Sequence, residues 1–407
     1  MLNFTKLSLA KFFLTLFLTT LTFSDNLVYF FISWVGLNIS LYSVLLGAGT
    51  TFKFKKSIGP SELTLKYFIV GAMLTTFFLF TMVLSAIDDG GSIFFESLFD
   101  IMYLSLILFK LGAFPFHFYL RDMYSILCPV DTMFTYTLNL KVNMFFMLTK
   151  VLGEVSDDIA FPILVLSAIG SIVSGAVGAL TQQKLKPFFA YSYLNSLGFS
   201  FLPFLTDSDS DLAIVYFLIY ALAWWVILLV LQSNSTKVSD KIESTINGYN
   251  VDNLLVANMY VKNTKDAILA INHRNANSIG IRNTAFIVSF SSLLGLPPTL
   301  GFYAKAAVYF DLVGSDSGQL LLILALVFTP VMAYSYLRVI IKMVYPFVGN
   351  KFSNLNLRKT ITQSPLTVVL SGKSSVIYSN ITVIVVLFVI ILIATPVFWY
   401  LSGGLFI

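Results

Sequence analysis

Long apolar stretches alternate with short polar ones along almost the whole chain. Each is close to, or longer than, the roughly 17 to 25 residues that span a bilayer as an α-helix. They cover residues 7–23, 26–48, 64–87, 93–120, 129–152, 159–180, 187–205, 211–233, 283–312, 317–345 and 379–402. The pattern predicts an all-α polytopic membrane protein with about eleven transmembrane helices.

The charges between these stretches divide into two faces. One set of alternate loops is basic and holds Lys53, Lys55, Lys56, Arg121, Lys184, Lys186, Lys262, Lys265, Arg274, Lys351, Arg358, Lys359 and Lys373. The other set is acidic and holds Asp25, Asp88, Asp89, Glu154, Asp157, Asp158, Asp207, Asp209, Asp211 and Asp316. A miscounted helix would scramble this alternation, so the charges support the count. By the positive-inside rule the basic face, with the N-terminus, is cytoplasmic or matrix, and the C-terminus lies opposite.

Two of the apolar stretches are interrupted. Gly112 and Pro115 fall inside 93–120, and Pro297 and Pro298 fall inside 283–312. Proline removes a helical hydrogen bond, so both stretches are predicted to be broken helices.

Each break occupies the fourth helix of a five-helix unit. Five is odd, so consecutive units are predicted to be inverted repeats whose broken helices line an ion site near the midplane. The predicted division is a first repeat at 1–152, a second at 153–345 with an extramembrane loop at 234–282, and a loop plus C-terminal helix at 346–407.

Composition narrows the possible functions. The 407 residues are 57% hydrophobic and 11% charged, too apolar for a soluble globule. Cys128, His117 and His273 are too few for a zinc, haem or iron–sulfur site. The net charge of +5 is scattered over loops, so no nucleic acid partner is expected. The aromatic excess is interpreted as lipid-facing packing and interface anchoring.

Three lysines, Lys110, Lys141 and Lys305, lie inside apolar runs. A cation near the bilayer centre costs roughly 2.5 to 3.5 kcal/mol, and such residues usually mark ion or proton paths. A lysine in an apolar setting can both take up and release a proton near neutral pH. The lysines therefore predict a proton path, and the alternative is a structural role such as pairing with a backbone carbonyl.

Several motifs carry a family resemblance. They are FKLGAFPFHFYLRDMY from Phe109, ALTQQKLKPFFAYSYLNSLGF from Ala179, GLPPTLGFYAK from Gly295, YSYLRVIIKMVY from Tyr334 and WVGLNISLYSVLL from Trp34. Their order resembles that of the antiporter-like membrane subunits of respiratory complex I, in particular the mitochondrial type of the NADH-ubiquinone oxidoreductase chain 2 family.

The resemblance implies roles for the three lysines. Lys110 matches the family's central lysine, which exchanges protons with a glutamate on a neighbouring helix. Lys141 matches the next lysine of the path, and Lys305 matches the lysine of the second broken helix, which leads to the far side.

The chain departs from the family pattern at two positions. Asn38 stands where the family has that glutamate, and Ser196 stands where a histidine is expected. Asp100 is a candidate replacement acid, although it lies ten residues, about 15 Å of helix, from Lys110. His117 fits the family motif and is either structural or part of the relay.

The resemblance also implies a setting. The chain is expected to be a multi-pass subunit of the proton-translocating NADH:ubiquinone reductase in the mitochondrial inner membrane, with its N-terminus in the matrix and its C-terminus in the intermembrane space. It would bind no cofactor itself, while other subunits hold NADH, FMN, iron–sulfur clusters and ubiquinone. Expected partners are the other membrane-arm subunits, lipids and, as an open option, a separate chain supplying N-terminal helices found in bacterial relatives.

Two alternatives remain open at this point. One is a subunit of the related multi-subunit sodium/proton antiporters. The other is a structural membrane subunit whose proton path was lost with the glutamate.

Overall fold

The computed structural model describes residues 2–24, 26–51, 60–87, 93–126, 135–182, 185–206, 210–235, 276–297, 299–315 and 318–344. Within these ranges every regular element is a helix.

The first three helices are α1 (Leu2–Thr22), α2 (Leu27–Thr51) and α3 (Pro60–Ile87). The next group is α4 (Ile93–Leu111), the 3-10 turn η1 (Phe116–Tyr119), α5 (Leu120–Ile126), the π-helical segment η2 (Thr135–Leu140) and α7 (Lys141–Leu152). It is followed by α8 (Asp157–Thr181), α9 (Leu185–Phe201), the 3-10 turn η3 (Leu202–Leu205) and α10 (Ser210–Ser235). The last group is α14 (Ala276–Leu294), α15 (Leu300–Gly314) and α16 (Gly318–Val344).

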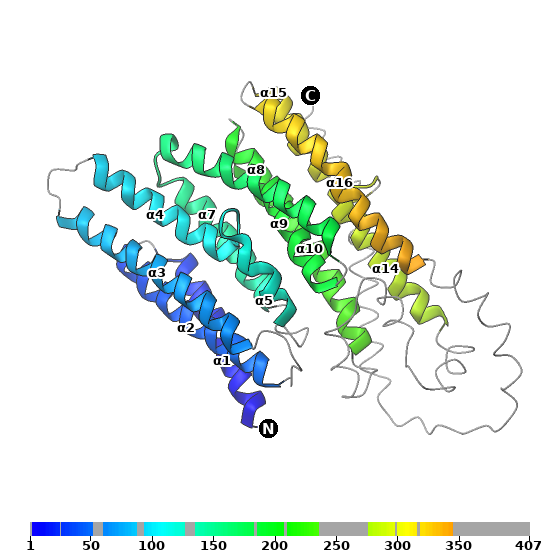
Figure 1. The fold of residues 1–407 in the computed structure, drawn as a ribbon, viewed down its shortest axis with the longest axis horizontal. Coiled ribbons are helices and arrows are strands. Elements are labelled where there is room, and N and C mark those ends of the chain that lie inside the picture. The colour runs from blue at the N-terminus through cyan, green and yellow to red at the C-terminus, as the bar shows by residue number, and fades with distance from the viewer. Residues whose placement is uncertain are drawn as a thin grey trace, which may run out of the picture.

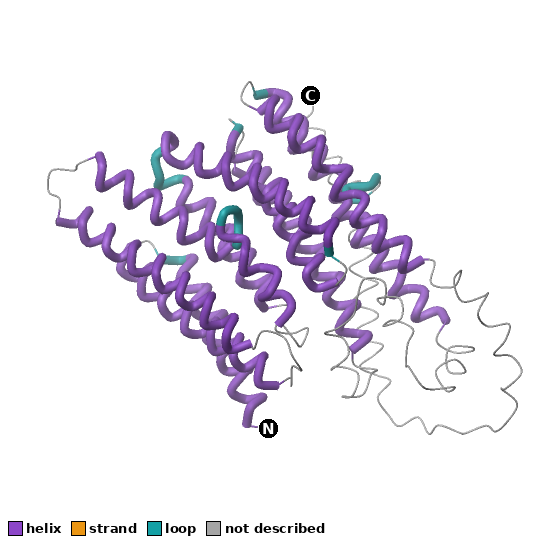
Figure 2. Tube along the Cα trace, in the orientation of Figure 1, coloured by secondary structure: helices purple, strands orange, loops and turns teal. Residues whose placement is uncertain are grey.

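The helices run nearly parallel to one another, and the N-terminal and C-terminal helices lie at opposite ends of the assembly (Figure 1). Within it α1 packs on α2, α3 on α4, α8 on both α9 and α16, and α10 on α14. Figure 2 shows how short the described connections are, including the one that separates α4 from α5. Long helices, whose backbone groups are paired within each helix, are what a membrane-spanning bundle requires.

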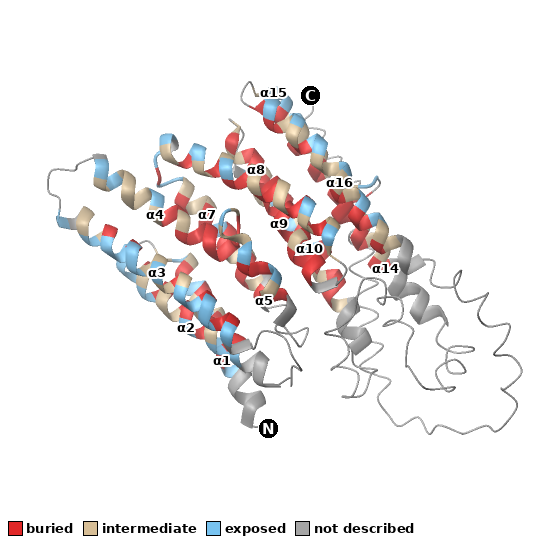
Figure 3. Ribbon diagram, in the orientation of Figure 1, coloured by how far each residue is buried: buried red, intermediate tan, exposed pale blue. Residues whose placement is uncertain are grey.

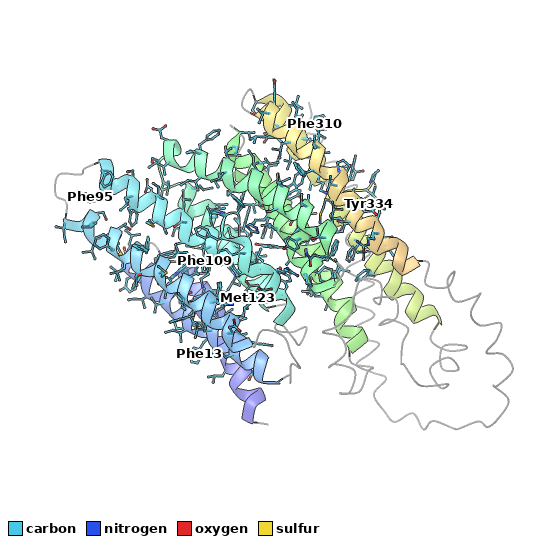
Figure 4. The ribbon with its side chains drawn as sticks, in the orientation of Figure 1. Phe13, Phe95, Phe109, Met123, Phe310 and Tyr334 are labelled. Carbon is cyan, nitrogen blue, oxygen red and sulfur yellow. The ribbon has the colours of Figure 1, made fainter. Side chains whose placement is uncertain are left out.

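Burial is concentrated where the helices face one another, and the outer face of α3 is largely exposed (Figure 3). Phe109 and Met123 are 1% and 0% exposed, whereas Phe13 and Phe310 are 42% and 62% exposed and lie on outer helix faces (Figure 4). Large apolar side chains on the outside are expected when the surrounding solvent is lipid.

Six helical stretches of the described chain are long and apolar enough to cross a membrane. They are Leu27–Leu46, Glu62–Ser85, Phe94–Tyr124, Asp158–Thr181, Asp211–Leu229 and Gly318–Ile340. The prediction of an all-α polytopic membrane protein is confirmed. The predicted helix at 379–402 lies outside the described residues.

Both interrupted helices are found where glycine and proline predicted them, between α4 and α5 and between α14 and α15. The predicted extramembrane segment 234–282 overlaps two helix ends, since α10 continues to Ser235 and α14 begins at Ala276, and residues 236–275 lie outside the described residues. The division into two repeats and a C-terminal part stays a prediction.

Candidate functional site

The two helix breaks have the same backbone geometry. Gly112 and Gly295 take φ values of +75° and +81°, a left-handed conformation that glycine adopts without steric cost. The Gly112 N–H donates to Leu108 O and Phe109 O at 2.9 and 3.0 Å, and the Ala113 N–H donates to Leu108 O at 3.0 Å.

The second break repeats this arrangement. The Gly295 N–H donates to Ser291 O and Ser292 O at 3.0 and 3.1 Å, and the Leu296 N–H donates to Ser291 O at 3.1 Å. This is the Schellman ending of a helix, in which the two residues after the end satisfy some of its last carbonyls. The carbonyls of the two residues just before the glycine are left for other donors.

Two of the predicted lysines supply those donors. Lys141 Nζ donates to Lys110 O at 2.6 Å and to Leu111 O at 2.7 Å, at the end of α4. Lys305 Nζ donates to Leu293 O at 3.1 Å and to Leu294 O at 2.8 Å, at the end of α14. A cation is stabilised there because a helix C-terminus carries a partial negative charge.

The carbonyl pairing that the sequence left open is therefore present at both lysines. The two differ in origin, since Lys141 comes from the helix after the broken one and Lys305 from the second half of the same broken helix.

Tyrosines complete the surroundings of Lys141. Tyr193 donates its hydroxyl hydrogen bond to Leu111 O at 3.1 Å, and Tyr119 donates to Phe109 O. The rings of Tyr119, Tyr136 and Tyr193 lie 5.8, 5.1 and 5.4 Å from Lys141 Nζ. The ammonium is thus enclosed by carbonyl oxygens on one side and by aromatic rings on the others.

Lys110 points into a different environment. Its Nζ donates a hydrogen bond to the Tyr67 hydroxyl at 3.2 Å. The same Nζ lies 5.8 Å from the Trp34 ring, 5.9 Å from the Tyr42 ring and 5.0 Å from the Tyr67 ring. With the side chain 1% exposed, these cation–π contacts form an aromatic cage around a buried ammonium.

Asn38 lies on α2 midway between Trp34 and Tyr42, four residues from each, and so shares their helix face. The residue is 7% exposed and its Oδ1 has no hydrogen-bond partner in the described part of the chain. No carboxylate of those residues forms an ion pair with Lys110, Lys141 or Lys305. Elsewhere, Lys66 Nζ and Glu62 Oε1 form an exposed ion pair at 2.9 Å.

Asp100 and His117, which the sequence also suggested, make contacts with residues other than the three lysines. Asp100 accepts hydrogen bonds from Ser156 Oγ at 3.2 Å and Ser156 N at 3.4 Å, so it is engaged at the loop before α8. His117 is half-buried, stacks on Phe114 with ring centroids 5.5 Å apart, and has an Nδ1 without a partner among the described residues.

Ser196 is buried and donates to the Tyr193 backbone oxygen at 2.7 Å, one turn back on α9. Pro115 and Pro297 are exposed at the two breaks, and Pro298 lies outside the described residues. No group of three or more His, Cys, Asp and Glu side chains in the described ranges could hold a metal ion.

The tyrosines around the lysines were not predicted from the sequence. The aromatic excess was interpreted as lipid-facing packing and interface anchoring, yet Tyr67, Tyr119, Tyr136 and Tyr193 are at most 5% exposed and surround the lysines. Their place in the sequence could have indicated this, because Tyr119 and Tyr193 lie inside the same motifs that carry Lys110 and Ser196.

The comparisons with known proteins bear directly on this arrangement. The sequence model of the family described as NADH:quinone oxidoreductase/Mrp antiporter, transmembrane, matches residues 24–333, which include both breaks and all three lysines. The chain belongs to this family.

Relatives in the NADH:quinone oxidoreductase/Mrp antiporter family support the assignment. NADH-quinone oxidoreductase subunit N of Thiobacillus denitrificans is 28% identical over 330 residues, covering 76% of this chain and 62% of the relative. NADH-ubiquinone oxidoreductase chain 2 of Anopheles gambiae is 26% identical over 307 residues, covering 75% of this chain and 77% of the relative. The chain spans 61 to 62% of the length of the first bacterial relatives that it matches.

A solved structure shares the fold. A chain in respiratory complex I from Thermus thermophilus with bound aureothin superposes with a TM-score of 0.65 at 22% identity, covering 96% of this chain and 79% of that one. At this identity the match establishes the fold of the family, and the chemistry has to be argued from the residues.

Proposed function

We propose that the chain is a proton-translocating core subunit in the membrane arm of an NADH:quinone oxidoreductase, respiratory complex I. The observation that carries this proposal is the set of three buried lysines at two matching helix breaks. Among the described residues they have carbonyls, rings and a hydroxyl as partners and no carboxylate. The names of the relatives, NADH-quinone oxidoreductase subunit N and chain 2, favour complex I over a sodium/proton antiporter.

Each lysine has a charged and a neutral state, and its surroundings bind the two states with different strength. In the charged state, the ammonium of Lys141 binds the partially negative end of α4 through two carbonyls, and Lys305 binds the end of α14 in the same way. Loss of a proton weakens these contacts and releases the side chain to accept another proton. The lysine is therefore a proton carrier whose position depends on its charge.

Lys110 and Lys141 are coupled by proximity. Lys141 Nζ binds the backbone oxygen of Lys110, and two positive charges brought close together repel each other. Protonation of one therefore disfavours protonation of the other. A proton that arrives at one lysine therefore favours release of a proton from the other.

Lys110 can hold its charge without the family's acid. A cation–π contact contributes about 2 kcal/mol when desolvated, and Lys110 has such contacts with Trp34, Tyr42 and Tyr67. The cage replaces part of the stabilisation that a glutamate at position 38 would supply. The departure at Asn38 is thus compatible with a working proton path.

The proposed setting follows the loop charges. The basic loops and the N-terminus lie in the mitochondrial matrix, the acidic loops and the C-terminus face the intermembrane space, and the chain is embedded in the inner membrane. Its partners are the other membrane-arm subunits and the surrounding lipids. NADH, FMN, iron–sulfur clusters and ubiquinone are bound in other subunits, and this chain contributes no redox centre.

Complex membership is tested on a native gel of gently solubilised membranes, with in-gel NADH oxidation and mass spectrometry of the band that holds this chain. Co-migration with NADH dehydrogenase activity and flavin subunits is the expected result. Migration apart from that activity, together with cation-dependent proton exchange without NADH oxidation, would establish the sodium/proton antiporter instead.

Proton translocation is tested by replacing Lys110 or Lys305 with Met, which keeps the volume and removes the charge. The ratio of protons moved to NADH oxidised should fall in the assembled complex. Lys66→Met is the matched control, because Lys66 is exposed on α3 and pairs with Glu62 in its own helix. An unchanged ratio in both Lys110→Met and Lys305→Met would leave the chain a structural membrane subunit.

A further inference from the structure

An irregular turn precedes the helix that carries Lys141. The segment η2 (Thr135–Leu140) is π-helical and passes directly into the regular helix α7, whose first residue is Lys141. In a π-helix each backbone carbonyl accepts a hydrogen bond from the residue five positions on, so the turn holds one residue more than an α-helical turn. Such turns are rare and are frequent at functional sites.

The π-helical turn decides which side chains share a face with Lys141. Tyr136 lies five residues before Lys141, and its ring is 5.1 Å from Lys141 Nζ. In an α-helix, residues five apart differ in direction by about 140°, because each residue advances by about 100°. In a π-helix the same spacing is that of the hydrogen bond, so the two residues lie one above the other. The additional residue of η2 therefore brings Tyr136 to the ammonium.

The turn also sets the direction of Lys141 relative to α4. If η2 became α-helical at the same chain length, Lys141 would rotate by about 100° relative to the residues before the turn. Its two bonds to the end of α4, at 2.6 Å to Lys110 O and 2.7 Å to Leu111 O, depend on the present direction. Lys141 and Tyr136 are 0% and 3% exposed, so the packed surroundings leave no space for a second arrangement.

The side chain of Asn143 bridges the junction of η2 and α7. Its Nδ2 donates to Asn139 O at 2.7 Å and to Asn139 Oδ1 at 3.0 Å. The amide nitrogen carries two hydrogens, so it makes both bonds at once. The bridge begins in η2 and ends in α7, and Lys141 lies between its two ends. Because asparagine is a poor residue for a helix interior, two of them four positions apart in a membrane helix need a specific reason.

We propose that Asn143 is a positioning residue for Lys141. Its amide holds the π-helical turn η2, and the turn presents the Lys141 ammonium to the carbonyls at the end of α4. This role rests on the proposed function, in which Lys141 carries protons. Asn143 itself transfers none, because an amide does not titrate.

The first variant is Asn143→Leu, which keeps the branched shape and removes both hydrogen bonds. The rate of proton translocation by the assembled complex should fall about 100-fold, the scale of loss that a misplaced reacting group produces. Thr149→Val is the matched control, because it removes a hydrogen bond from a side chain to a carbonyl of the same helix, that of Thr149 Oγ1 to Phe146 O at 2.8 Å. Its translocation rate should be unchanged.

A pair of small residues separates the hydrogen bond from packing. A serine hydroxyl in a helix donates to the carbonyl four residues back, which from position 143 is Asn139 O. Asn143→Ser and Asn143→Ala differ by one oxygen, so they lose the same packing. Translocation should be retained in Asn143→Ser and lost in Asn143→Ala. Equal rates in the two variants would overturn the positioning role, and this pair decides the question if Asn143→Leu does not assemble on a native gel.

Deletion of the additional residue tests the turn itself. Without Leu138, Tyr136 lies four residues before the lysine, a spacing that puts both on one face of an α-helix. The turn then has no π-helical geometry to hold, so Asn143→Leu should cause no further loss of translocation in the Leu138-deleted chain. A further loss in that chain as large as in the full-length one would show that the amide does not act through the turn.

Replacing the lysine separates this role from the proposed function. Loss of translocation in Lys141→Met with a normal rate in Asn143→Leu would overturn the role of Asn143 and leave the proposed function standing. A normal rate in both would also overturn the part of the proposed function that assigns a proton to Lys141.

Discussion

At the scale of single residues, Lys110 raises the question of what a buried ammonium needs when its acid is absent. The cage of Trp34, Tyr42 and Tyr67 supplies quadrupole attraction and one hydroxyl, and Asn38 adds a polar oxygen without a partner in the described chain. Breaking a buried ion pair is strongly destabilising because it leaves one charge unpaired. A carboxylate at position 38 would therefore stabilise the charged form of Lys110.

We predict that Asn38→Glu raises the stability of the folded protein. The carboxylate would lie on the helix face shared by Trp34 and Tyr42, within reach of the Lys110 ammonium, and a charged hydrogen bond is worth about 1.5 to 3 kcal/mol. Thermal unfolding of the purified protein measures the change, and Asn38→Gln is the control because it has the same length without the charge. Equal unfolding temperatures for the Glu and Gln variants would mean that Lys110 is not accessible from position 38.

At the scale of elements, each helix break combines a left-handed glycine, a helix end and a lysine that binds its carbonyls. At Gly295 the backbone lies close to the lysine side chain, since a Cβ added to this glycine would lie 2.8 Å from Lys305 Cδ. The positive φ of +81° adds a steric penalty of about 1 to 2 kcal/mol for any other residue.

Gly295→Ala should therefore both destabilise the break and push Lys305 from its two carbonyls. We expect a lower unfolding temperature together with slower proton translocation. Gly314→Ala is the matched control at the end of α15, where an added Cβ meets nothing within 4 Å, and its effect should stay within about 0.5 kcal/mol. If the two alanine variants behave alike, the glycine conformation is not what sets the break.

The sequence predicts the breaks well because their causes are local. Glycine and proline act on their own backbone, so Gly112 and Gly295 mark the ends of α4 and α14 directly. The carbonyl bonds of Lys141 are a different case, since they depend on how α7 packs against the end of α4 some 30 residues earlier. The tyrosines around the lysines were missed for the same reason, because an aromatic residue facing lipid and one facing an ammonium share the same local pattern.

At the scale of the whole molecule, the loop charges predict on which side of the membrane each loop lies. The helix α8 is the most suitable one for testing this topology. Its 25 residues span roughly 37 Å, enough to cross a hydrocarbon core of about 30 Å. Glu154, just before α8, and Thr181, at its end, are both exposed. They belong to an acidic and a basic loop respectively, so they should lie on opposite sides of the membrane.

We predict opposite labelling of cysteines placed at these two positions. In a Cys128→Ser background, which removes the single native cysteine, Thr181→Cys should react with a membrane-impermeant maleimide from the matrix side and Glu154→Cys from the other side. Ser171→Cys, in the middle of α8 and 0% exposed, is the unreactive control. Opposite but exchanged sides would reverse the proposed orientation while keeping the fold, and labelling of both from one side would mean that α8 does not cross the bilayer. Because successive helices alternate in direction, the result at α8 also fixes the orientation of the two broken helices that carry the lysines before and after it.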